Sequence, residues 1–119
     1  MTIRCKQVDK AFKLLRDGIE DANDHIKNPQ VHPEIKQVYR LKLRILIDIR
    51  ESFDEYATVY DLIHSDTPYK EIFSDYLKGE IKLYESGIGE ISERLILNTL
   101  YQFRIELMKR LIEKYQKFV

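Results

Sequence analysis

Residues that cross-link or break the backbone are scarce in this chain of 119 residues. Four glycines and three prolines leave little material for a fold rich in loops. The single cysteine, Cys5, has no second cysteine with which to form an internal disulfide, a pattern typical of a reducing compartment. The N-terminus has no apolar core of the kind found in signal peptides, and no apolar run approaches the roughly 20 residues that span a bilayer. We therefore expect a cytoplasmic protein without a membrane partner.

An excess of either charge is also lacking. The chain has 20 basic and 20 acidic residues, which removes any bulk attraction to nucleic acid or to an anionic membrane. Its length is sufficient for one hydrophobic core but not for two. A content of 44 % hydrophobic and 34 % charged residues is typical of a helical bundle with a large surface. We expect one domain over residues 1–119.

The longest periodic stretch runs from Pro33 to His64. Its apolar face repeats at alternating spacings of four and three residues, which returns a side chain to the same side of a helix at every turn. Alternation within Leu41–Ile49 would also suit a strand, but turn residues do not flank it and no partner strand is evident. We predict one helix, in which Leu43 and Ile47 lie off the main face and need a second neighbour, in this chain or another. The face comprises Ile35, Tyr39, Lys42, Leu46, Ile49, Phe53, Tyr56, Tyr60 and Ile63.

Three further helices are predicted at residues 5–27, at residues 68–86 and from about residue 88 almost to Val119. The intervening turns are expected at residues 28–30, 65–68 and 86–89, where proline or glycine occurs. Gly18 lies beside the apolar face of the first helix, where the missing side chain would let another helix approach closely. The fold prediction is all-α: an antiparallel bundle of about four helices with long second and fourth helices.

These helix lengths do not match one another. If all helices are straight, the last dozen residues of the fourth helix extend past the others, although they are strongly apolar. Two arrangements remain open: the bundle bends to close on itself, or this segment joins two copies as a homodimer. The residues expected at such an interface are Leu107, Met108, Leu111, Ile112, Tyr115 and Phe118.

Charged residues interrupt the apolar faces at Lys42, Glu80 and Arg104. An isolated buried charge costs several kcal/mol, so each must pair or extend to solvent. We expect Arg94 to pair with Glu80, and Lys42 to extend to solvent. The acid expected opposite Arg104 is Asp61. The set Lys42, Glu80, Arg94 and Arg104 is interpreted as core polar pairing that fixes helix register, or alternatively as a polar site in the core.

The residues that carry chemistry do not form a known catalytic or metal motif. A carboxylate-bridged metal bundle needs two Glu-x-x-His segments, whereas this chain has a single Asp-x-x-His, at Asp61–His64. Cys5 has no histidine within reach along the sequence. Gly87-Ile88-Gly89 lacks the third glycine and the preceding strand of a nucleotide-binding loop. We expect no catalytic residue, no cofactor and no metal, and hence no enzyme.

Charge is segregated along the chain. Residues 39–50 contain four basic residues and one acidic residue, and residues 100–119 contain five basic and two acidic residues. Residues 51–77 instead contain seven acidic residues and one basic residue. Such segregation suits complementary surfaces between protein chains. The predicted function is a non-enzymatic protein–protein interaction module (an adaptor, an inhibitor or immunity-type protein, or a small assembly subunit) that self-associates. The alternative is a nucleic-acid-associated subunit whose phosphate contacts would be Arg40, Arg44, Lys109, Arg110 and Lys114.

Overall fold

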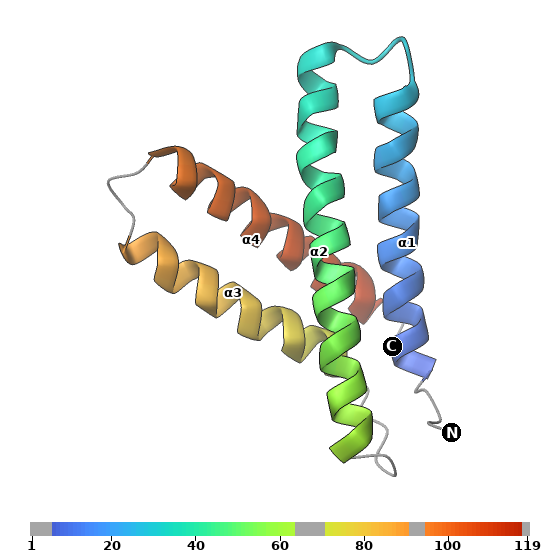
Figure 1. Cartoon of the computed structure of the whole chain (residues 1–119), viewed down its shortest axis with the longest axis vertical. Helices are drawn as coiled ribbons and strands as arrows, with labels where there is room; N and C mark the ends of the chain where they lie inside the picture. The colour runs from blue at the N-terminus through green and yellow to red at the C-terminus, as the bar shows by residue number, and fades with distance from the viewer. Residues whose placement is uncertain (1–5, 64–70, 91–94, 118–119) are drawn as a thin grey trace.

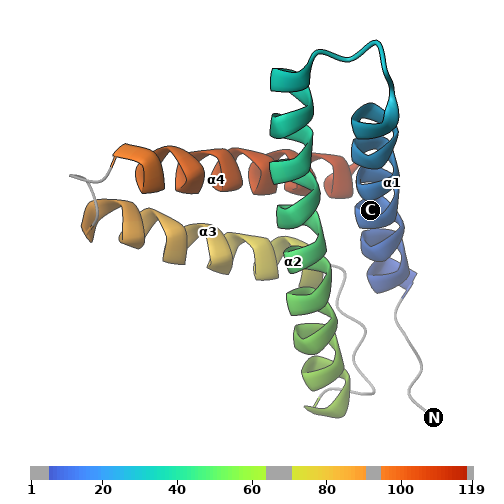
Figure 2. The same cartoon turned by 45° about the horizontal axis from the view of Figure 1, so that its top comes forward.

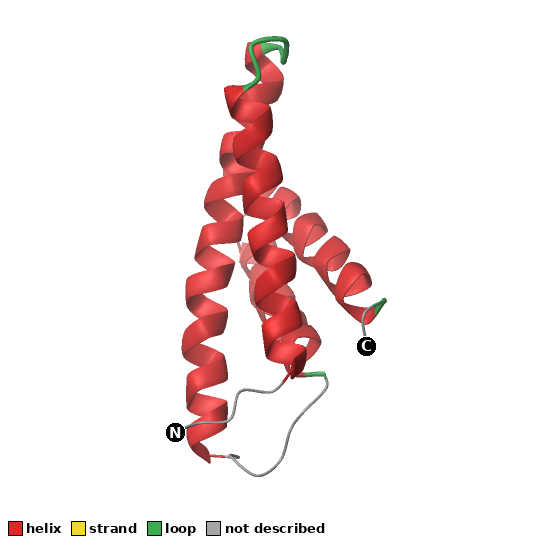
Figure 3. Ribbon diagram, turned by 90° about the vertical axis from the view of Figure 1, so that its right-hand side faces the viewer, coloured by secondary structure: helices red, strands yellow, loops and turns green. Residues whose placement is uncertain are grey.

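The computed structural model describes residues 6–63, 71–90 and 95–117, and nearly all of them are helical (Figure 3). The described residues contain no strand, and Leu41–Ile49 lies inside a helix. The predicted all-helical fold is therefore confirmed. The four helices are α1 (Lys6–Lys27), α2 (Pro33–Ile63), α3 (Ile72–Glu90) and α4 (Leu95–Gln116).

The helices form two hairpins rather than four parallel rods. α1 packs along α2, and α3 packs along α4. The α3/α4 hairpin crosses the α1/α2 hairpin steeply, so that both ends of α2 extend beyond the crossing (Figure 1 and Figure 2). This crossing closes the core without a long overhang.

The first turn follows the predicted residues closely. The side chain of Asn28 accepts a hydrogen bond of 2.9 Å from the backbone N–H of Gln30. His32 then caps α2, because its Nδ1 accepts a 3.1 Å hydrogen bond from the backbone N–H of Glu34. The ring of His25 stacks on that of Tyr39 with centroids 4.1 Å apart, which joins the ends of α1 and α2. The predicted turn at residues 65–68 lies outside the described residues.

Gly18 marks a close approach between α1 and α2, as the sequence predicts. A Cβ atom at this position would lie 3.1 Å from Cδ1 of Leu46, which is tighter than normal packing. Leu46 is itself buried on the central face of α2. The missing side chain therefore sets the spacing of the first hairpin.

The predicted turn at Gly87 and Gly89 is wrong. α3 continues through both glycines to Glu90, and α4 begins only at Leu95, so α4 has 22 residues. A Cβ atom at Gly87 would lie 2.8 Å from Cε2 of Tyr101. The glycine permits close packing of α3 against α4 instead of ending a helix.

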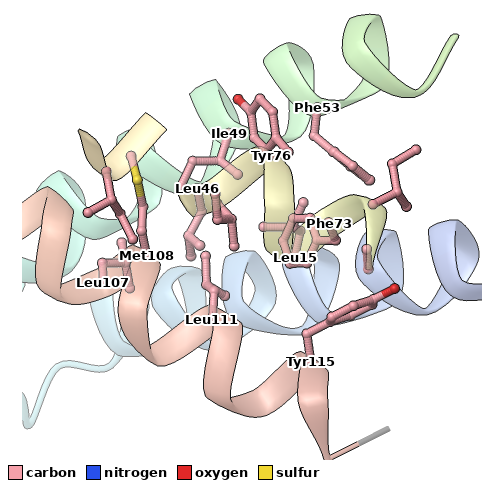
Figure 4. Packing of buried hydrophobic residues seen from close by; sticks show 14 of the residues in the cluster. Leu15, Leu46, Ile49, Phe53, Phe73, Tyr76, Leu107, Met108, Leu111 and Tyr115 are labelled. Atoms are coloured by element: carbon pink, nitrogen blue, oxygen red, sulfur yellow. The ribbon is translucent and has the colours of Figure 1, made fainter. Parts of the chain in front are cut away.

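All four helices contribute to one buried core (Figure 4). In the close-up, Met108 and Leu111 of α4 lie among Leu46 and Ile49 of α2 and Leu15 of α1. The central face of α2 is buried in its middle, but Ile35 and Tyr56 towards its two ends are exposed.

The predicted self-association surface on α4 is corrected by this packing. Four of its members, Leu107, Met108, Leu111 and Tyr115, are buried in the core of their own chain, with at most 6 % of each residue exposed. Ile112 is half-buried and packs against the same core, while Phe118 lies outside the described residues. The two-hairpin arrangement supplies the neighbours that a straight bundle would have lacked, so these side chains are not available to a second copy.

A pair of glycine variants tests the packing of α3 on α4. Gly87→Ala is expected to lower the free energy of unfolding by about 1 kcal/mol, because displacing the Tyr101 ring costs more than the gain in helix propensity. Gly79→Ala on the same helix meets nothing within 4 Å and is expected to raise it by up to about 1 kcal/mol. Urea denaturation measures both. Equal stabilisation by the two variants would show that Tyr101 does not constrain Gly87.

Candidate functional site

Polar, aromatic and apolar side chains meet where α2 crosses the α3/α4 hairpin. A pocket of about 240 Å³ opens there, and we call it the crossing pocket. Three helices meet at this pocket because the second hairpin passes the middle of α2 (Figure 1). Its lining residues are Leu41, Arg44, Ile45 and Asp48 from α2, Tyr84 from α3, and Leu100, Tyr101 and Arg104 from α4.

Arg104 is the central polar residue of the crossing pocket. Its guanidinium carbon lies 4.7 Å from the centroid of the Tyr84 ring, which is within cation–π range. Its Nη1 lies 3.6 Å from Oδ2 of Asp48, and the Arg104 and Asp48 side chains are 19 % and 50 % exposed. The Nε of Arg104 is buried without a hydrogen-bond partner in the described part of the chain. The guanidinium thus retains unused hydrogen-bonding capacity beside an open pocket.

The aromatic part of the pocket is rigidly built. The rings of Tyr84 and Tyr101 meet edge to face, with centroids 5.0 Å apart and an interplanar angle of 89°. Burial raises the pKa of Tyr84, the nearby Arg104 opposes this rise, and Glu80 and Asp48 add to it. The hydroxyl of Tyr84 is therefore protonated at neutral pH and available as a hydrogen-bond donor.

An apolar surface continues from the pocket along both crossing helices. Leu100 of α4 is 38 % exposed at its lining. Val38 is 50 % exposed and lies one helical turn before Leu41, on the same side of α2. The pocket and this surface together offer apolar contact with a few polar groups, an arrangement suited to holding part of another molecule.

The expected core polar set does not gather at one place. Lys42 is half-buried, with its ammonium 5.8 Å from the centroid of the Tyr39 ring, and it lies outside the crossing pocket. Glu80 is also half-buried, and its expected partner Arg94 lies outside the described residues. The acid beside Arg104 is Asp48 rather than the predicted Asp61. This prediction failed because α4 crosses the middle of α2 instead of running along it.

The basic residues assigned to phosphate contacts are divided between two sides of α2. Arg110 and Lys114 line a second pocket of about 170 Å³ with Lys42, Asp17 and Asp21, between α1, α2 and α4. A helix turns about 100° per residue, so Lys42 and the pocket-lining Arg44 point roughly 200° apart. They do not form one continuous basic stripe with each other.

Two more of these bases are also exposed. Arg40 lies on α2 one turn before Arg44. Lys109 is exposed on α4, with its Nζ 4.0 Å from Oε1 of Glu106.

The sequence interpretation did not assign Asp48, Tyr84 or Leu100 to a site. Tyrosines, aspartates and leucines are common on helical bundles, so their spacing carries no specific signal. The register of one hairpin on the other brings them together. A search of the described residues for three or more histidine, cysteine, aspartate or glutamate side chains placed to hold a metal ion found none. The same residues contain no helix long and apolar enough to cross a membrane.

Comparison of the chain with protein-family models, with curated proteins and with solved structures found no match.

Proposed function

We propose that this chain is a non-enzymatic protein-binding module that docks its partner in the crossing pocket and on the adjoining apolar surface of α2 and α4. The observation that carries the proposal is the convergence of apolar, aromatic and arginine side chains from three helices around one pocket. Buried centres of protein interfaces are enriched in tyrosine and arginine, which combine large contact area with directed hydrogen bonds. Leu100, Tyr101 and Arg104 supply this combination from one helix.

The charges around the pocket favour a protein partner over a polyanion. Arg44 and Arg104 are balanced by Asp48 in the lining and by Glu80, which lies near enough to raise the pKa of Tyr84. These carboxylates would repel the phosphates of a nucleic acid, whereas a protein surface with both positive and negative side chains can pair with both charges. The accessible part of the Arg104 side chain, which is 19 % exposed, could donate hydrogen bonds to acceptors on such a partner.

The test is a comparison of two exposed leucines. A cross-linking capture from the native host extract would use the wild-type chain, Leu100→Glu and Leu83→Glu. Leu83 is 67 % exposed on α3 and does not line the crossing pocket, so it controls for a new surface charge. We expect a specific set of proteins to be retained by the wild type and by Leu83→Glu but lost with Leu100→Glu. Retention of the same set by all three would refute docking at this pocket.

Nucleic acid is the alternative class of partner, and the arrangement of the basic side chains supports it less well. Arg44 points away from Lys42, which shares a pocket with Arg110 and Lys114, and two aspartates line that pocket. Binding that depends on phosphate neutralisation weakens steeply with salt. A steep log–log salt slope with nonspecific DNA or RNA would therefore favour this alternative.

A further inference from the structure

One long side of α2 is turned away from both of its neighbours. Figure 1 shows α1 beside α2 and the α3/α4 hairpin behind it, with no described helix in front. Among residues 40–55, steps of 100° per residue place seven within an arc of about 120° on the side of α2 away from Leu46 and Ile49 of the core. We call this side the α2 outer face. Its residues between positions 40 and 55 are Arg40, Leu43, Arg44, Ile47, Glu51, Asp54 and Glu55.

The middle of the α2 outer face is apolar. Leu43 and Ile47 are one turn apart, and both are half-buried. Neither belongs to the partly buried hydrophobic side chains that pack against the core cluster. Both lie off the main face of α2, and the described helices give them no place in the core.

The ends of the same face carry opposite charges. Arg40 and Arg44 are exposed one turn apart on either side of Leu43, and Glu51 and Glu55 are exposed one turn apart after Ile47. Like charges four residues apart destabilise an isolated helix. In the described part of the chain, none of the four takes part in an ion pair.

The four charges are placed symmetrically about one point. Arg44 and Glu51 are equally distant along the helix from the midpoint between residues 47 and 48, and so are Arg40 and Glu55. A two-fold axis through that midpoint, perpendicular to the helix, exchanges the basic half of one α2 with the acidic half of another. The pattern on this face is therefore complementary to itself in an antiparallel arrangement, which is the requirement for an isologous interface.

We infer that two copies of this chain associate through the α2 outer face, with their α2 helices antiparallel. Arg40 and Arg44 of each copy then lie near Glu55 and Glu51 of the other. Ile47 of each copy lies beside Ile47 of the other at the axis, and Leu43 of each copy lies about one turn away from it. Two apolar residues per copy make a small interface, so the association is weak and depends on charge. Arg44 also lines the crossing pocket, so the two surfaces adjoin there, but Leu100 of α4 lies outside the outer face.

Charge reversal tests this pairing by sedimentation equilibrium over a wide micromolar range at low salt. The wild type is expected to dimerise. Arg40→Glu with Arg44→Glu makes the charges of the outer face acidic in both halves, and Glu51→Arg with Glu55→Arg makes them predominantly basic. Each double variant alone is expected to dimerise at least about tenfold more weakly, because like charges then face each other. An equimolar mixture of the two is expected to recover association as a one-to-one complex.

The control is a pair of reversals elsewhere on the surface. Lys78→Glu with Lys82→Glu changes two exposed bases of α3 and is expected to leave dimerisation unaltered. Circular dichroism confirms that each variant is folded. A wild type that is monomeric throughout the range overturns the inference. A dimer whose dissociation constant is unchanged by the outer-face reversals also overturns it, and so does a failure of the two double variants to associate when mixed. Loss of partner capture by Leu100→Glu bears only on the proposed function, since that residue lies outside the outer face.

Discussion

Replacing Phe53 with alanine is expected to lower the free energy of unfolding by about 3–5 kcal/mol, the range for a buried phenylalanine. Phe53 is fully buried at the junction of the two hairpins. Its ring centroid lies 5.3 Å from that of Phe12 on α1, and 4.8 Å and 5.5 Å from those of Phe73 and Tyr76 on α3. Removing the ring leaves a cavity that touches both hairpins. Urea denaturation of the wild type and of Phe53→Ala measures the loss of stability.

The matched control is Tyr56→Ala, on the next turn of α2. This tyrosine is 40 % exposed, although its ring lies 5.3 Å from that of Tyr76. Much of its surface is already in water, so its removal is expected to cost less than half as much as removal of Phe53. Similar losses for both variants would mean that Phe53 is not the centre of the contact between the hairpins.

The sequence was sufficient to predict the first hairpin. Pro29 and Pro33 bracket its turn, and α2 starts at the predicted residue, Pro33, and is described as far as Ile63. The periodicity of α2 is long enough to outweigh the strand-like alternation inside it. Gly18 was also interpreted correctly, because a glycine inside a strongly periodic helix costs stability unless a neighbouring helix occupies the space that a side chain would fill.

The second hairpin was harder to predict because a glycine can either end a helix or let two helices pack closely. Gly87 and Gly89 look like a turn in the sequence, but neither adopts the positive φ that would mark a glycine-specific turn. The partner that requires Gly87 is Tyr101, which is fourteen residues later and meets it only after the hairpin has formed. Local sequence patterns do not contain this information.

The crossing of the hairpins was not predictable, and the candidate site depends on it. Straight helices folded back at each turn place Arg104 beside Asp61, whereas the steep crossing places it beside Asp48 and Tyr84. Crossing angles depend on how side-chain ridges from several helices fit together. The periodicity of each helix identifies its apolar face but does not fix that angle.

A substitution at Met108 tests whether this residue lies in the core of one chain or in an interface between two copies. It is fully buried within its own chain, although the sequence also allowed it to lie between two chains. Met108→Glu is therefore expected to unfold the protein at every concentration, because an unpaired carboxylate in the core costs several kcal/mol. That cost is comparable with the whole stability of a small domain, about 5–15 kcal/mol. Far-ultraviolet circular dichroism would report loss of helix together with loss of a cooperative urea transition.

Leu100→Glu provides the control on the same helix, two turns earlier. Its side chain is 38 % exposed at the crossing pocket, so the new carboxylate can remain hydrated and the chain is expected to stay folded. A seam between copies would give another result for Met108→Glu: a folded, fully helical monomer that no longer associates. That outcome would return the C-terminal half of α4 to an interface and contradict its burial in the monomer. Unfolding of Met108→Glu alone, with Leu100→Glu intact, instead assigns the apolar residues of α4 to the core on which the crossing of the two hairpins depends.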